Sequence, residues 1–231
     1  MARASACRVG TPADTLWTNA VVAPTLPRPA AAQYIVPMDA NTGGFRAEYL
    51  SELDVARIQL LALAAAVPEE LYSWRPTDGT RSFSAVLVHI AAGNLMLLWM
   101  TGVRTPAGEN LYASIDGDDL GRVGAMIRIN VSLERTLTDK QGVMQLLTRS
   151  FDAAREAFSA VEDLDRSGTF LGQQGTVRRV YLRMLAHSHE HMGQAIAYVR
   201  SCGLEAPWPD PLKDLDQFLA DARSRQSASA G

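Results

Sequence analysis

Hydrophobic residues recur every three or four positions in four stretches of the chain, the spacing that places them on one face of an α-helix. A shorter helical stretch is expected around residues 126–137, and a last amphipathic segment over residues 212–222. Neither alternation nor a short apolar run predicts a convincing strand, so the sequence indicates an all-α four-helix bundle. The four main helices are predicted over residues 45–67, 82 or 84 to about 100, 139 or 140 to about 160, and 177 to about 201.

Residues 1–44 show no sustained periodicity and end in the turn-forming run Asn41-Thr42-Gly43-Gly44. They predict a leader that precedes the fold, and the bundle domain is expected over residues 45–225. Arginines followed by an apolar stretch over residues 16–22 imitate a signal peptide, although Pro24 and Pro27 interrupt it. The leader is therefore either a signal-like segment or a disordered one, and a cytoplasmic protein is the favoured interpretation, with export as the alternative.

Charge and cysteine content narrow the range of partners. The net charge is -3, and the 22 basic residues are scattered among 25 acidic ones, so a nucleic-acid partner is not expected. No apolar run of roughly 20 residues was apparent, so a membrane partner is not expected either. Cys7 and Cys202 stand far apart, which supports neither a disulfide framework nor a thiolate metal site.

Three of the four histidines fall within five residues, at His187, His189 and His191. Residues four apart on a helix stand one above the other, so His187 and His191 can bind one metal ion together. His189 is turned away from that face by two residues of helical rotation. The remaining histidine, His89, interrupts the apolar face of the second helix, and facing helices of a bundle can build a shared metal site. We expect His89, His187 and His191 to be metal ligands.

Other interpretations of these residues remain open. A single histidine on an apolar face often bonds a backbone carbonyl, and an isolated H-x-x-x-H pair arises by chance on many helices. Ser188 stands where a zinc protease would need glutamate, so Glu190 is at most a weak general base and no catalytic residue is assigned. Gln194, one turn beyond His191, and Asn94, a little over one turn beyond His89, could orient ligands or substrate, or could simply be polar helix residues.

The stretch from Leu185 to Gln194 (LAHSHEHMGQ) and the following Tyr198-Val199-Arg200 resemble the signature of the DinB-like superfamily. Tyr72-Ser73-Trp74-Arg75-Pro76, and the run from Arg81-Ser82 into His89, agree with it in order and spacing. The resemblance implies an up-up-down-down four-helix bundle, often a homodimer, with a divalent ion, commonly zinc or nickel, on a histidine triad. The same three histidines match the ligand positions of the family.

Two classes of function follow from the resemblance and from the open coordination that three histidines leave. The first is a metal-dependent transferase that joins a small-molecule thiol, such as bacillithiol, mycothiol or glutathione, to an electrophile. The same site could instead activate water, as in a metal-dependent hydrolase. The second class is a non-catalytic metal-binding stress-response module.

Overall fold

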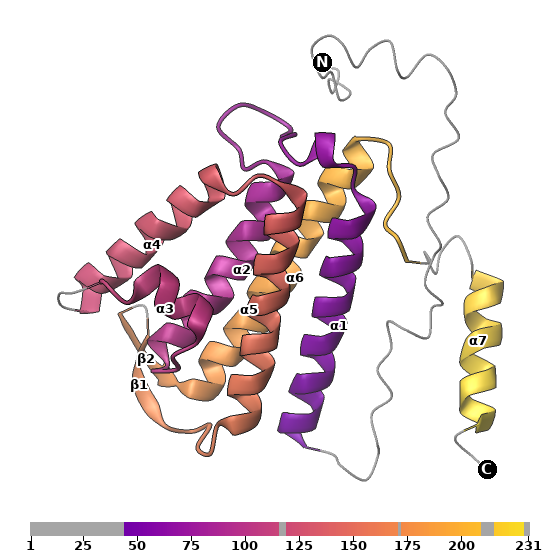
Figure 1. Ribbon diagram of the computed structural model, residues 1–231. Helices are drawn as coiled ribbons and strands as arrows, with labels where there is room; N and C mark the ends of the chain where they lie inside the picture. The colour runs from indigo at the N-terminus through magenta and orange to yellow at the C-terminus, as the bar shows by residue number, and fades with distance from the viewer. Residues whose placement is uncertain (1–43, 116–118, 171, 209–214, 229–231) are drawn as a thin grey trace, which may run out of the picture.

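The computed structural model describes residues 44–115, 119–170, 172–208 and 215–228, and the predicted leader lies outside these residues. Within them the chain is almost entirely helical, with one small antiparallel hairpin (Figure 1). The all-α prediction is confirmed. The elements are α1 (Phe45–Ala66), the 3-10 turn η3 (Glu69–Leu71), α2 (Phe83–Met100), α3 (Pro106–Tyr112), α4 (Asp119–Thr136), α5 (Lys140–Ala160), β1 (Ser167–Phe170), β2 (Gln173–Thr176), α6 (Val177–Ser201) and α7 (Leu215–Ala228).

Side-chain caps explain where the long helices begin. Ser82 Oγ accepts a hydrogen bond from the Ala85 amide at the start of α2, and Asp139 does the same for Gly142 at the start of α5. Each cap satisfies a backbone donor that has no partner within the helix. Gly203 follows the end of α6 with a φ of 75°, a conformation that glycine adopts without strain. The predicted bounds of the four main helices are confirmed to within about two residues.

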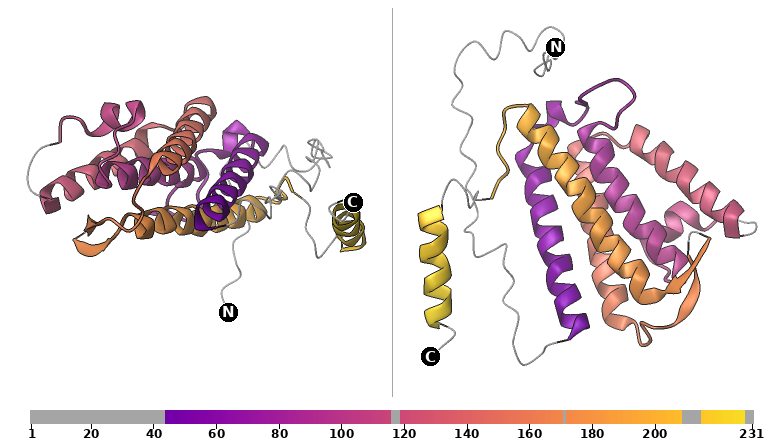
Figure 2. Two further views of the ribbon diagram at one scale, coloured as in Figure 1. Left: turned by 90° about the horizontal axis from the view of Figure 1, so that it is seen from below. Right: turned by 180° about the vertical axis from the view of Figure 1, so that it is seen from behind.

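Helix α2 is the centre of the bundle and packs against α4, α5 and α6 (Figure 2). No apolar run long enough to cross a membrane was predicted from the sequence, but α2 meets that criterion by length and composition. However, 78% of this segment is buried inside the protein. Its apolar surface is therefore covered by the neighbouring helices. Because several sides of α2 face protein, buried residues lie all round the helix and not only on the face predicted from the spacing.

The order of helix directions differs from the predicted up-up-down-down. Tyr72, just after α1, donates to the Ala64 carbonyl at 2.7 Å while Phe83 opens α2 beside it, so α1 and α2 run in opposite directions. Lys140 at the start of α5 bonds the Val67 carbonyl past the end of α1, and Tyr49 near the start of α1 bonds the Tyr181 carbonyl near the start of α6. The bundle is therefore up-down-down-up, because the link between α1 and α2 folds back on itself at one end, where the Phe83 amide donates to the Trp74 carbonyl.

The segment between α2 and α5 contains two helices where the sequence predicted a loop and one short helix. Helices α2 and α5 run in the same direction, so the chain must return along the bundle between them. Helix α4 makes this return and packs along α2, and α3 lies beside the lower part of α2 (Figure 1). The predicted turn near Gly168 and Gly175 is the hairpin of β1 and β2, in which these two glycines pair. Helix α7 stands apart from the bundle in each view (Figures 1 and 2).

Candidate metal centre

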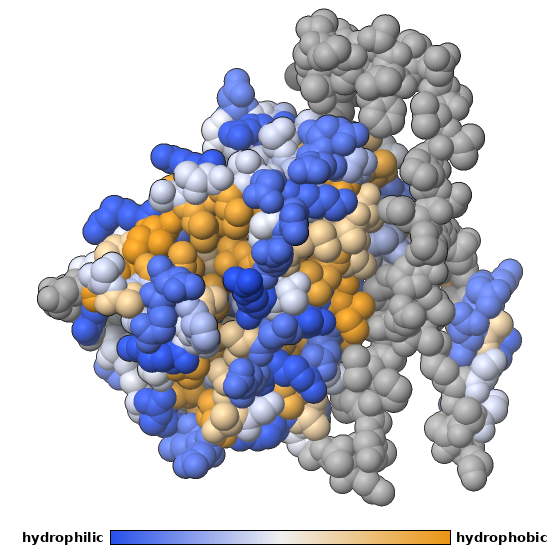
Figure 3. Space-filling model, viewed as in Figure 1, coloured by the Kyte–Doolittle hydropathy of each residue, from blue (hydrophilic) through white to orange (hydrophobic). Residues whose placement is uncertain are grey.

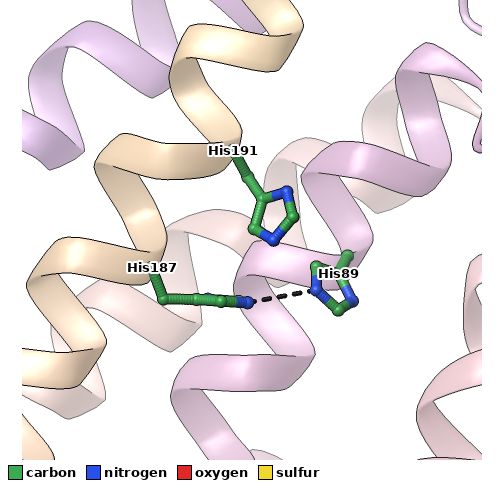
Figure 4. A group of neighbouring side chains, drawn as sticks. All are labelled: His89, His187 and His191. Atoms are coloured by element: carbon green, nitrogen blue, oxygen red, sulfur yellow. Dashed lines mark hydrogen bonds between the residues drawn. The ribbon is translucent and has the colours of Figure 1, made fainter.

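Three histidine side chains from α2 and α6 converge between the two helices (Figure 4). His89 comes from α2, and His187 and His191 come from successive turns of α6. Their ring centroids lie 4.5 to 4.8 Å apart, and the Nε2 atoms of His89 and His187 are 3.0 Å apart. Each ring offers one nitrogen, and these nitrogens all lie within 4.8 Å of one another. The group could therefore hold a metal ion, and His189 is not part of it.

Gly93, one turn beyond His89, makes room for the His187 ring. A Cβ atom at this position would lie 2.7 Å from Cε1 and 3.2 Å from Nδ1 of His187, closer than real contacts allow. The absence of a side chain thus lets α2 approach the imidazole directly. Only the packing of α2 against α6 reveals what this glycine accommodates.

Glu134 on α4 fixes the orientation of His89, and this residue was not identified from the sequence. Its Oε1 lies 2.7 Å from Nδ1 of His89, and Arg81 binds its Oε2 at 2.7 Å. Burial would raise the pKa of Glu134, but the hydrogen bonds from His89 and Arg81 outweigh this effect and hold the pKa below its usual value. Because an ionised carboxylate only accepts, Nδ1 of His89 carries the proton and Nε2 is left with a free lone pair.

Gln194 plays the corresponding part for His191. Its Oε1 lies 2.9 Å from Nδ1 of His191, and its amide nitrogen donates to the Tyr198 hydroxyl at 2.8 Å. Since the amide oxygen accepts, the His191 Nδ1 is the donor and Nε2 again keeps its lone pair. The Tyr198 ring is held edge-on by Trp74, with 5.5 Å between centroids.

Asn94, which was predicted together with Gln194 as a residue that could orient ligands, lies on a different side of α2. It is fully buried, and its amide nitrogen points to Ser150 on α5 at 3.5 Å. Five residues beyond His89 correspond to about 140° of helical rotation, which explains why Asn94 faces α5 instead of α6. The contacts of Asn94 within the described residues therefore give it no part in orienting the histidines.

The surroundings favour the neutral form of His187 and His191. Burial, with further contributions from His89, His191 and two arginines, lowers the pKa of His187 to about 3. Burial also lowers the pKa of His191. The Nδ1 atom of His187 is buried without a hydrogen-bond partner. Neutral imidazoles have a lone pair available at neutral pH, and such nitrogen donors suit zinc, nickel, copper and iron.

An open cleft of about 740 Å³ adjoins the histidine group at the end of the bundle where α2 begins. Glu134 and Gln194, the two residues that contact His89 and His191, both form part of its wall. Its volume is within the range of pockets that bind small molecules. The cleft is lined by Arg75, Gly79, Thr80, Arg81, Ser82, Ala85, Val131, Glu134, Arg135, Thr138, Gln194 and Tyr198.

The comparison with protein families agrees with the fold and with the histidine group. The family model described as DinB superfamily matches residues 52–195, more than half of the 231-residue chain. The match runs from the second turn of α1 onward through most of α6 and includes all three histidines of the group. No curated protein matches the chain.

Proposed function

The chain belongs to the DinB superfamily, and from this premise we propose that it is a metal-dependent enzyme of the thiol S-transferase type. In this proposal His89, His187 and His191 hold one divalent ion, zinc or nickel. A small-molecule thiol and an electrophile are the two substrates. The family match and the convergence of the three imidazoles support the proposal.

The observation that carries the proposal is that the imidazoles of His89 and His191 are both oriented by hydrogen bonds so that they can bind one shared metal ion. Glu134 and Gln194 occupy the Nδ1 positions of His89 and His191, so their Nε2 lone pairs are directed to the centre of the group. Partners of this kind are the usual companions of metal-binding histidines. A lone core histidine would need only one backbone carbonyl, and would not account for three rings brought together.

Three protein ligands leave further coordination positions for a substrate, as in catalytic and not structural sites. When bound, the ion would act as a Lewis acid that lowers the pKa of a coordinated thiol and favours the nucleophilic thiolate. The protein contributes the geometry. Glu134 and Gln194 hold the rings, Gly93 admits His187, and the cleft lined by Glu134 and Gln194 has room for a small molecule beside them.

Elemental analysis and a thiol-transfer assay on protein without a histidine tag test this proposal together. We expect about one zinc or nickel ion per chain, and consumption of a thiol in the presence of monobromobimane or a chlorinated nitrobenzene. His191→Ala should lose both properties, whereas the matched variant His189→Ala should keep both. His189→Ala also removes one imidazole from this part of α6, but His189 lies outside the histidine group.

The alternative outcomes separate the other functions. Metal without transfer, but with hydrolysis of an activated ester, would support a metal-dependent hydrolase in place of the transferase. Metal with no turnover of either kind would support a non-catalytic metal-binding module. Protein that binds no divalent ion would overturn the proposal. The homodimer stays a prediction from the family resemblance, and the cytoplasmic location stays a prediction from the sequence.

A further inference from the structure

The cleft beside the histidine group carries an excess of positive charge. Three guanidinium groups line it, from Arg75, Arg81 and Arg135, and they face one carboxylate, that of Glu134. The end of the bundle where this cleft opens is coloured mostly hydrophilic in Figure 3. Because both charges of the Glu134–Arg81 pair belong to the wall, two of the three arginines are left without a carboxylate in the cleft.

The three arginines have different partners. Arg81 is committed to Glu134, and through it to His89, so its role is to position the histidine. Arg75 is exposed, and its recorded hydrogen bond is a long one, 3.5 Å, to the Thr80 carbonyl. Arg135 is exposed at the end of α4 and forms no ion pair with another described residue. The charges of Arg75 and Arg135 are therefore available to a ligand.

The position of these charges connects them with the histidine group. Arg75 comes from the link between α1 and α2, and Arg135 follows Glu134 directly along α4. A small molecule in the cleft would share it with these arginines and with Glu134 and Gln194, the two lining residues that contact His89 and His191. The planar guanidinium fork matches the two oxygens of a carboxylate.

We propose that the thiol used by this protein carries a carboxylate, and that Arg75 and Arg135 bind this carboxylate in the cleft. The inference rests on the proposed thiol transfer, because it names the class of thiol that the same site accepts. The arginines select the substrate by charge and hold its anionic end, while its sulfur is directed to the histidine group.

Binding of S-methylglutathione and of its diethyl ester, measured by calorimetry at low ionic strength, tests this proposal. The methylated sulfur has no thiolate to offer a metal, so binding of this probe reports on the cleft itself. The ester keeps the same backbone but masks both carboxylates. We expect the free acid to bind about tenfold more tightly than the ester, and this preference to shrink as added salt screens the charges.

The double variant Arg75→Gln/Arg135→Gln should bind the acid and the ester about equally. The matched control is Arg149→Gln, which removes the same charge from an exposed position of α5 that does not line this cleft. We expect it to keep the tenfold preference. Circular dichroism and thermal melting verify that each variant is folded.

Three results would overturn the proposal: no preference in the unmodified protein, a preference that survives in the double variant, or an equal loss in Arg149→Gln. Metal content is measured on the same samples. Protein without metal that still prefers the acid would count against the proposed transferase and not against the carboxylate site. Protein that binds metal and transfers thiols but shows no preference for the acid would count against the carboxylate site and not against the proposed transferase.

Discussion

Replacing Gly93 with alanine changes a single methyl group at the point where α2 meets the His187 ring. The added Cβ would lie 2.7 Å from Cε1 of His187, which is 0.7 Å short of the 3.4 Å where ordinary van der Waals contact begins. Since both atoms sit on packed helices, the ring must move by a large part of that 0.7 Å. Metal sites tolerate displacements of about 0.2 Å in ligand distance.

We therefore expect Gly93→Ala to weaken zinc binding by roughly a hundredfold, in the range seen when the support of a metal ligand is removed. The metal-free protein should change less. Alanine favours the helix by about 1 kcal/mol over glycine, and overpacking costs about 1 to 3 kcal/mol. The free energy of unfolding should thus fall by no more than about 2 kcal/mol. Competition with a chromogenic chelator measures the affinity, and urea unfolding of metal-free protein measures the stability.

Gly193→Ala is the matched control, because this glycine lies on α6 within two residues of His191 but a Cβ there would meet nothing within 4 Å. It should keep the zinc affinity of the unmodified protein and gain up to about 1 kcal/mol of stability from helix propensity. If Gly93→Ala bound zinc as tightly as Gly193→Ala, the placement of the His187 ring against α2 would not govern the site, and the reasoning would be refuted.

Further predictions concern the contact of Glu134 with His89, the pH dependence and the bundle ends. Glu134→Gln keeps a group that can accept from His89 but removes the charge, so zinc affinity should fall by about tenfold in the chelator assay; unchanged affinity would contradict this role. In metal-free protein, unfolded His187 takes up a proton near pH 6.5 but the folded residue does so only near pH 3. Stability from this residue is therefore complete above pH 6.5 and is lost as the pH falls toward 3, with about 1 kcal/mol lost by pH 5 after allowance for partial exposure. Urea unfolding at pH 7 and pH 5 should show a smaller difference in His187→Gln than in the unmodified protein, and an equal difference would count against the assignment. Arg46 donates at 2.6 Å to the carbonyls of Phe158 and Val161 at the end of α5. Arg46→Ala should therefore lower the free energy of unfolding by about 1 to 2 kcal/mol, which a lower thermal melting temperature would report. An unchanged melting temperature would show that water replaces these bonds at no cost.

The long helices could be predicted because their signals are local. Ser82, Asp139 and Gly203 each act on backbone within a few residues, so caps and periodicity are visible in the sequence alone. The pairing of His187 with His191 is equally local, because it depends on one turn of a single helix. Joining His89 to them needed a bundle in which α2 faces α6, and the family resemblance supplied that arrangement.

Other parts of the site depend on contacts between elements that are distant in sequence. Glu134 meets His89 only because α4 returns along α2, and the sequence placed no long helix there. A signal was nevertheless present: Met126, Asn130 and Glu134 recur every four residues and are all buried, so polar groups occupy the inner face of α4. Asn94 shows the opposite case, since a spacing of about one turn suggested the site, whereas its rotation around α2 carries it to α5.

The central claim, that three histidines from α2 and α6 share one ion, is tested most directly by the metal content of four tag-free proteins. These are the unmodified protein, His89→Ala, His187→Ala and His189→Ala, each loaded with zinc, dialysed and subjected to elemental analysis. The account predicts about one ion per chain in the unmodified protein and in His189→Ala, and a small fraction of that in the other two. An equal loss in His187→Ala and His189→Ala, or full retention in His89→Ala, would contradict it.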